Sequence, residues 1–356
     1  MSERLPETDL TAATISVPLE GLRNLLIALL TKFSVFEYDA KVAVERMLDA
    51  DLRGIPQHGA MKVLELIQAM DAGDIDPRGR MLTVVDKPAF AVLDGSRALG
   101  MVAATRGMEL AIKKARECGT GTVAVGNSQT LGAASAYALL ATREGMLGCC
   151  ITSTGGATVT APGTHQGATG NHGIAWAVPA GDTPLVIDLS NGSTSWGKVQ
   201  LLKELGLPLP QGIAVTSSGD VATAPQDAAK LLQGGGALGF GLGLMASVLA
   251  GPLAGGKMPI HKRRATVSSN DSEHFCYVID IAQFTDVDRF RQEVSTALQD
   301  IRQLPPVDSA VPVRVPGDRG HARTQELLAS GSVPLLKSAA NQIASLAARK
   351  KLEVPW

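Results

Sequence analysis

Apolar residues recur at helical spacing in several long stretches of this chain. The first stretch, Val17 to Leu48, predicts two helices that are separated by a short connection at Ser34-Val35-Phe36. Another, Leu99 to Cys118, keeps the same period and stops at Gly119, where glycine commonly ends a helix. Further helices are expected within the ranges 57–72, 132–144, 193–206, 228–250, 286–303 and 337–351.

Shorter apolar runs lie between these helices and predict strands. Residues 81 to 93 alternate as paired strands do, and Asp94-Gly95 follows as a turn signal. Other strands are expected at 121–126, 147–152, 174–179, 185–189, 274–281 and 311–315. The order of helices and strands predicts an α/β protein with a largely parallel or mixed sheet. The glycine-rich stretch 155–173 is expected to be a loop at a functional site.

Composition and charge exclude several classes of protein. With 356 residues, 45% of them hydrophobic and 19% charged, the chain can bury a sizeable core in more than one lobe. The 33 Lys and Arg against 34 Asp and Glu leave a formal charge of −1, so we expect neither nucleic acid nor an anionic membrane as a partner. The N-terminus has no apolar core of a secretory signal, and the apolar stretch Leu238 to Leu253 is short for a membrane span.

Cysteines and histidines show no metal-binding spacing. The four cysteines predict reduced core thiols in a cytoplasmic protein, and the six histidines are scattered, so no metal site is expected. The glycines in Gly239-Phe-Gly241-Leu-Gly243 do not form the dinucleotide fingerprint and are expected to allow close helix packing. A phosphate loop, a serine-hydrolase elbow and a zincin motif are also missing from the sequence. A Rossmann enzyme, a serine hydrolase and a zinc protease are therefore disfavoured.

The stretch from Arg53 to Lys62 carries the strongest candidate chemistry. If the chain after Gly59 is helical, His58 and Lys62 lie on one helix face. A proton donor beside a cation suits a site that binds a small carboxylate and reduces the neighbouring group. A structural histidine and a solvated surface lysine are the alternatives at these two positions.

Six segments together resemble the malate/L-lactate dehydrogenase-like family of NAD(P)H-dependent oxidoreductases. The family includes ureidoglycolate and sulfolactate dehydrogenases, diketogulonate reductase and piperideine/pyrroline-carboxylate reductase. The resembling segments lie in order at 50–59, 123–128, 170–179, 186–190, 235–242 and 314–318, so the match covers nearly the whole chain.

The resemblance implies a non-Rossmann α/β fold with interleaved lobes, a mixed sheet, and helices at both ends of the chain. It implies a helical lobe of residues 1–84 with 305–356 and a substrate-side lobe of 85–120 with 262–304. Residues 121–261 would form the cofactor-binding domain. It also implies NADPH or NADH as the cofactor and a homodimer whose active sites lie near the subunit interface.

Individual residues take their roles from the same resemblance. His58 matches a proposed proton donor, and Lys62 stands where many members have a carboxylate-binding arginine. Asp188 matches a loop at the nicotinamide cofactor and is also a candidate to orient the histidine. The other matches to cofactor-binding positions are Ser190, Ser193, Pro316, Gly317 and Asp318.

Four departures from the family pattern concern the chemistry. Gln57 replaces the serine before the histidine, Thr130 replaces a second histidine, and Leu238 replaces a lysine. A Gly-Thr-Asn-Pro motif has become Gly170-Asn-His-Gly173. We assign Gln57, Thr130 and His172 to substrate binding, with His172 as a candidate to replace the missing histidine. An exposed loop position is the simpler interpretation of His172.

These residues predict hydride transfer to a C=N or C=O group beside a carboxylate. A cyclic imine is favoured, because an iminium is already electrophilic and tolerates the loss of an acid at Thr130. A 2-hydroxy-acid dehydrogenase, a reductase of a larger biosynthetic intermediate, and a degenerate member that binds ligand without turnover remain as alternatives. Neither the exact substrate and its stereochemistry nor the choice between NADPH and NADH follows from the residues.

Overall fold

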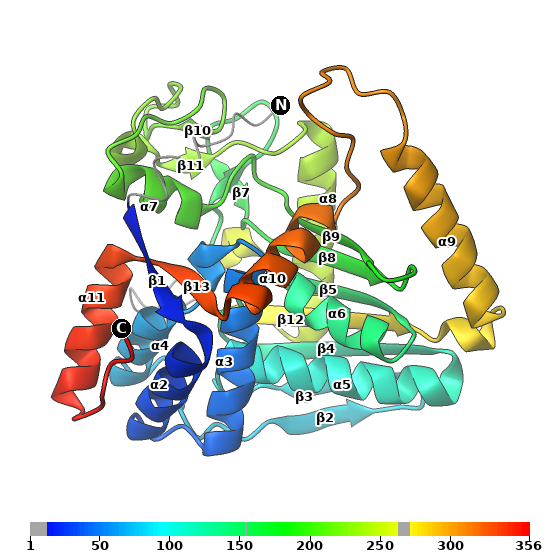
Figure 1. The fold of residues 1–356 in the computed structure, drawn as a ribbon, viewed down its shortest axis with the longest axis horizontal. Coiled ribbons are helices and arrows are strands. Elements are labelled where there is room, and N and C mark those ends of the chain that lie inside the picture. Colours follow the sequence, from blue (N-terminus) through cyan, green and yellow to red (C-terminus); the bar gives the residue numbers. More distant parts are fainter. Residues whose placement is uncertain (1–12, 154, 263–270) are drawn as a thin grey trace.

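A seven-stranded mixed sheet forms the centre of the molecule (Figure 1). The computed structural model describes residues 13–153, 155–262 and 271–356. The strand order is β2-β3-β4-β12-β5-β8-β9, and within the described sheet β3 and β4 are the one parallel pair of neighbours. The strands are β2 (Leu82–Asp86), β3 (Phe90–Asp94), β4 (Thr120–Ser128), β5 (Leu147–Ser153), β8 (Gly173–Val178), β9 (Leu185–Ser190) and β12 (Ser272–Ile279).

Helices cover both faces of this sheet. On one face lie α5 (Gly100–Cys118) and α6 (Ser135–Arg143), and α8 (Ala237–Leu249) lies on the other. Successive residues of a strand point to opposite faces, so Cys150 packs with α5 and α6 while its neighbour Cys149 packs with α8. Three of the four cysteines are buried as expected, but Cys118 at the end of α5 is exposed.

The two ends of the chain share one hydrophobic core. Its helices are α2 (Leu19–Lys32), α3 (Glu37–Leu52), α4 (Lys62–Asp71) and α11 (Lys337–Arg349). Strand β1 (Thr14–Pro18) pairs with β13 (Ser332–Leu336) beside them, and Figure 1 shows this pair next to α11. The expected terminal helices and the mixed sheet are therefore confirmed. The lobe boundaries stay a prediction.

A smaller sheet interrupts the stretch that was expected to be one loop. It contains β6 (Val159–Thr160) and β7 (Gly167–Thr169), together with β10 (Ala214–Val215) and β11 (Lys230–Leu231). Helix α7 (Trp196–Glu204) packs on it. The prediction of an uninterrupted loop over 155–173 is therefore wrong, because strands of two or three residues are too short to show a pattern.

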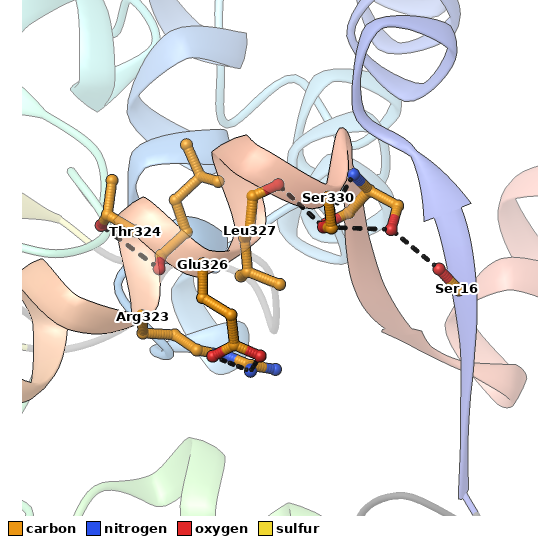
Figure 2. Close-up of polar contacts among 8 residues, drawn as sticks. Ser16, Arg323, Thr324, Glu326, Leu327 and Ser330 are labelled. Carbon is orange, nitrogen blue, oxygen red and sulfur yellow. Dashed lines mark hydrogen bonds and ion pairs between the residues drawn. The ribbon is translucent and has the colours of Figure 1, made fainter.

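The C-terminal region holds the clearest errors of element assignment. Residues 311–315, which the structure describes in full, form no strand, since Pro312 and the following Pro316 cannot donate to a ladder. After α9 (Val287–Arg302) the chain instead forms α10 (Asp318–Ser330), a helix that the sequence pattern did not predict. Figure 2 shows Ser330, the last residue of α10, linked to Ser16 of β1 through the first residue of β13: the Ser16 hydroxyl donates to Ser332 at 3.0 Å, and Ser332 lies 3.4 Å from the Ser330 hydroxyl.

Helix α8 is unusually apolar for a helix that covers a sheet. Among the described residues, the segment Ala237–Ala254 is the one with the length and composition of a membrane span, and 39% of it is buried. This 18-residue segment includes the turn after α8 and is longer than expected, so its length alone does not exclude a membrane span. Ala246 and Ala250 pack against β5, which gives one side of the helix a place in the core.

Candidate active site

The turn after α3 is built around a buried carboxylate. Asp51, in the last turn of α3, accepts a hydrogen bond of 2.7 Å from the Ala60 amide. A Cβ on Gly59 would overlap Asp51 Oδ1, so the carboxylate can approach only because this residue is glycine. Burial raises the pKa of Asp51 to about 7. This packing fixes the short 3-10 helix η1 (Pro56–His58), which ends at the candidate histidine.

His58 lies at the end of η1 with an unused imidazole nitrogen. Its Nδ1 is buried and has no hydrogen-bond partner among the described residues. Burial, and to a lesser extent the charge of Lys62, lowers the pKa of His58 to about 4. The imidazole is therefore neutral at physiological pH. Gly132 backs it closely, since a Cβ there would lie 4.0 Å from His58 Cβ.

Three predicted substrate residues lie around η1. A Cβ on Gly197 of α7 would lie 2.7 Å from Gln57 Cβ, so Gln57 is packed against α7. The Thr130 hydroxyl accepts from the Gly132 amide at 3.5 Å, which places it on the same segment that backs His58. Lys62 instead points to Glu65, with its ammonium 2.7 and 2.8 Å from the two carboxylate oxygens.

Asp188 reaches the same region from β9. It pairs across the sheet with Ala175 on the α6 face, and its Oδ2 accepts from the Ser135 amide at 3.1 Å. The carboxylate thus caps the start of α6 from a neighbouring strand, a structural role for Asp188. Burial raises the pKa of Asp188, against the opposing effects of Ser135 and of the Arg53 charge. Within the described chain, no hydrogen bond joins Asp188 to His58.

The predicted C-terminal turn lies at the start of β9. Pro316 accepts from the Val186 amide at 3.2 Å, and Gly317 has a φ of +104°, which favours glycine. The Asp318 carboxylate binds Arg302 at 2.7 and 3.0 Å, and Arg302 holds the pKa of Asp318 below its usual range. This carboxylate therefore has a structural partner. The backbone of the turn is what meets the strand that carries Asp188.

The loop after β9 is held by side-chain and backbone hydrogen bonds. Ser193 donates from its hydroxyl to Gln233 O at 3.1 Å, and its amide donates to Leu232 O at 2.8 Å. The Ser190 hydroxyl donates to Gly192 O at 3.5 Å. These contacts place the loop next to residues 232–236, directly before α8.

His172 lies on the other face of the sheet from Asp188. Its Nε2 is 2.8 Å from the Ser247 hydroxyl of α8, and its amide donates to Asn191 at 2.7 Å. The side chain is fully buried, contrary to the expected exposed loop. Burial, with a contribution from Lys262, lowers the pKa of His172 to about 3. Its assignment to substrate binding stays a prediction, and the sheet separates it from the residues around His58.

The start of α8 has an open, glycine-rich turn. Gly235 and Gly236 have positive φ and open space where a Cβ would be, and the first amides of a helix have no partner within it. The Gly234 amide donates to Asn191 O at 2.8 Å, which ties this turn to the loop after β9. Leu238, in place of the family's lysine, is 71% exposed and offers no charge. By contrast, a Cβ on Gly239 would overlap Gly234 O, so this glycine packs closely against the turn before α8 and not against another helix.

Sequence reasoning missed Arg53 as a site residue. It occupies the last position before Gly54, whose φ of +76° turns the chain toward η1. A Cβ on Gly320 of α10 would lie 3.7 Å from the Arg53 guanidinium carbon. Arg53 therefore lies at the end of α3 and against α10. Its positive charge also opposes the rise that burial causes in the pKa of Asp188. Its position, five residues before His58, could have pointed to it. The sequence alone does not show which groups the side chain of a single arginine contacts.

Comparison with known proteins decides the family. The model of the family described as malate/L-lactate dehydrogenase matches residues 17–344. The chain belongs to this family. It is 30% identical over 350 residues to the malate dehydrogenase of Pyrococcus horikoshii, covering 95% of this chain and 96% of that protein. The structure of that enzyme superposes with a TM-score of 0.88 over 99% of both chains.

Other relatives differ in the substrate and cofactor that their names give. The ureidoglycolate dehydrogenase (NAD(+)) of Escherichia coli K12 is 28% identical, covering 84% of this chain and 86% of its own. The (2R)-3-sulfolactate dehydrogenase (NADP(+)) of Chromohalobacter salexigens is 29% identical, with 87% and 92% covered. The Δ1-piperideine-2-carboxylate reductase of Pseudomonas syringae shares the fold at a TM-score of 0.84, with 22% identity and 94% and 100% covered. The chain is thus an oxidoreductase that uses a nicotinamide cofactor.

Proposed function

We propose that this enzyme transfers hydride from NADPH or NADH to a C=N group of a cyclic imine, or to a C=O group, beside a carboxylate. When bound, the reduced nicotinamide supplies the hydride. The residues of this chain bind the acceptor, exclude water and provide the hydrogen bond at the reacting nitrogen or oxygen. The reaction class would suit a biosynthetic step, and a cytoplasmic location stays a prediction.

We propose an imine rather than a ketone as the acceptor because the imidazole of His58 is neutral and its Nδ1 has no hydrogen-bond partner among the described residues. A ketone needs a proton as its oxygen gains charge, and a histidine with a pKa of about 4 is not an imidazolium at neutral pH, so only the weakly acidic N–H of the neutral ring could supply that proton. A protonated imine brings its own proton and becomes a neutral amine when hydride arrives. The buried lone pair of His58 can then accept a hydrogen bond from the iminium N–H.

The neighbouring residues would shape this site. Gln57 and Thr130 line the turn on either side of His58 and could hydrogen-bond the acceptor. Asp188 would lie near the cofactor ring and stabilise a positive charge there, while it holds the start of α6. The loop with Ser190 and Ser193, with the turn at 316–318, would enclose the cofactor.

A second copy of the chain would cover the exposed side of α8. Leu238, Leu242, Met245 and Val248 follow one another at helical spacing and are all substantially exposed. Leu189, on the same face of the sheet, is 60% exposed. An apolar surface of this kind is typical of an oligomer interface. Light scattering of the purified protein tests the homodimer, and Met245→Glu should shift it toward monomer.

A 2-hydroxy-acid dehydrogenase is the second candidate function. The malate dehydrogenase from Pyrococcus horikoshii matches nearly the whole chain, and this match favours it. In the oxidation of a 2-hydroxy acid, a neutral His58 would accept the proton of the substrate hydroxyl group. Its low pKa would make it a weak base, which is why we prefer imine reduction.

A binding and turnover assay on one sample tests the proposal. Purified protein is titrated with NADPH and NADH while nicotinamide fluorescence is followed, and then cyclic imine carboxylates and 2-oxo acids are added. We expect saturable binding and rapid oxidation with pyrroline- or piperideine-2-carboxylate. Rapid oxidation with 2-oxo acids alone would support the dehydrogenase. Binding without turnover would favour a degenerate member, and no binding would contradict the function.

A further inference from the structure

We propose that Arg53 is the residue that binds the substrate carboxylate. This inference rests on the proposed reduction of a carboxylate-bearing acceptor. The resemblance assigns the carboxylate to Lys62, but the two cations differ in their existing partners. The ammonium of Lys62 is 2.7 and 2.8 Å from the two oxygens of Glu65. A ligand would have to displace this ion pair.

The Arg53 guanidinium makes only a long ion pair. Its Nε lies 4.0 Å from Asp49 Oδ2 one turn earlier in α3, which is beyond hydrogen-bond distance. Across residues 13–153, 155–262 and 271–356, no acceptor takes a hydrogen bond from this side chain, and Asp49 Oδ2 is itself without one. The Arg53 side chain is nevertheless only 11% exposed. A largely buried guanidinium with unused donors favours a charged ligand at its tip.

This guanidinium lies against α10. A Cβ on Gly320 would be in ordinary contact with Cζ and Nη2 of Arg53, at 3.7 Å from both. Thr324 fastens α10 to the end of α3, since its hydroxyl lies 3.3 Å from Leu52 O and 2.8 Å from Gly320 O (Figure 2). A side chain held in this way loses little freedom when it binds.

The electrostatics of the neighbourhood also suit an anion. The positive charge of Arg53 opposes the rise in the pKa of Asp188 that burial causes. Asp188 already accepts a hydrogen bond of 3.1 Å from the Ser135 amide, so part of its charge is compensated within the protein. A guanidinium can bind both carboxylate oxygens at once, which a lysine cannot do. The carboxylate would then be fixed in a plane beside the turn that carries His58.

A second arginine in the same neighbourhood provides a matched control. A Cβ on Gly54 would lie 3.9 Å from Arg323 Cγ, so Arg323 borders the same turn. Its guanidinium binds Glu326 at 2.7 and 2.8 Å, an ion pair that Figure 2 shows on the surface of α10. Substitution of Arg323 thus removes one positive charge from the same neighbourhood, but it removes a guanidinium that is already hydrogen-bonded to a carboxylate.

The experiment compares Arg53→Gln, Arg53→Lys, Lys62→Gln and Arg323→Gln in the full-length enzyme. For a cyclic imine carboxylate, Arg53→Gln should raise KM about 10- to 100-fold, the range of a charge-assisted hydrogen bond. Arg53→Lys should recover part of the loss, and Arg323→Gln should change KM less than about twofold. With the uncharged carboxamide of the same imine, wild type and Arg53→Gln should be alike.

Binding measurements separate failure of this inference from failure of the proposed function. Calorimetry with pyrrole-2-carboxylate, a planar acid that cannot be reduced as an imine, reports the carboxylate site without turnover. If this acid binds and Arg53→Gln weakens it, the inference stands even where no substrate turns over. A larger effect from Lys62→Gln than from Arg53→Gln overturns it. An equal loss of cofactor affinity in Arg53→Gln and Arg53→Lys also overturns the inference, because it would show that Arg53 has a structural role.

Discussion

His58 and His172 are both buried histidines whose pKa lies far below its usual value, yet their surroundings differ. The Ser247 hydroxyl lies 2.7 Å from Gly243 O and donates there, so it accepts from His172 Nε2. The His172 ring is therefore fixed in one tautomer on the α8 face. His58 makes no side-chain hydrogen bond to the described residues, and it stands at the end of the short helix η1 that follows Arg53 in the chain.

The difference shows that burial alone does not mark a catalytic histidine. His172 links α8 to the sheet through its Nε2, while its Nδ1, like that of His58, has no partner among the described residues. His58 keeps its imidazole free, and the backbone around it is held by Asp51 instead. A site that must bind changing partners needs a rigid backbone with unused polar atoms. The following predictions test this distinction.

The largest effect is expected from removal of the two histidines. His58→Ala should lower kcat/KM for the imine by about 10²-fold or more, with the cofactor Kd nearly unchanged. His172→Ala should mainly lower the thermal midpoint, because Ser247 and Asn191 lose a buried contact. Steady-state kinetics and calorimetric unfolding of both variants measure this. A greater loss of turnover from His172→Ala would reverse the assignment.

Asp51→Asn tests the support beneath His58. In the folded state Asp51 has a pKa of about 7, against 3.8 for an ordinary aspartate, so folding favours its protonated form. Wild type should therefore lose stability as the pH rises from about 4 to 7, by roughly 4 kcal/mol at most. Asn keeps an acceptor for the Ala60 amide and does not titrate. Denaturant unfolding at several pH values should show a flatter profile for the variant. Parallel profiles would contradict the assigned pKa.

Gly59→Ala tests the close approach of Asp51 to the turn. The added Cβ overlaps the carboxylate, so we expect a loss of about 1–3 kcal/mol together with lower turnover, because His58 moves. Gly241→Ala in α8 is the control. It has open space at the Cβ position and should stabilise the helix by up to about 1 kcal/mol. Equal effects of the two variants on turnover would show that the turn does not position His58.

Ser247→Ala should have the smallest effect on chemistry. It removes the acceptor of His172 Nε2 and leaves a buried donor unpaired, which costs about 1–3 kcal/mol. Turnover should stay within about twofold of wild type. Thermal unfolding and kinetics on the same preparation check both statements. A selective loss of turnover would return His172 to the substrate site.

The sequence predicted the long amphipathic helices well, because their apolar period is unambiguous. The segments corresponding to α2, α3, α5 and α9 all lie where the pattern placed them. It failed for α10, since a helix such as Asp318–Ser330 with one fully buried leucine has almost no apolar stripe. The alternating valines at 311–315 suggested a strand that the prolines forbid.

The candidate site was predicted in part for similar physical reasons. Motif order brought out His58, Asp188 and the turn at Pro316, and the structure joins this turn to the start of β9, the strand that carries Asp188. Motif order could not show that Lys62 is hydrogen-bonded to Glu65 while Arg53 makes only a long ion pair with Asp49, because that depends on side-chain contacts. Nor could it show that His172 faces α8, since its side of the strand was not apparent before the pairing of β8 with β9 was known.

The most direct test of the central claim compares kcat/KM for a cyclic imine carboxylate with that for the 2-oxo acid of equal carbon number, from pH 6 to about 9. The account predicts a large preference for the imine, with a pH dependence that follows protonation of the imine itself. The same dependence should persist in Asp51→Asn. A preference for the 2-oxo acid, with a rate governed by an enzyme group of pKa near neutrality that disappears in His58→Ala, would contradict it.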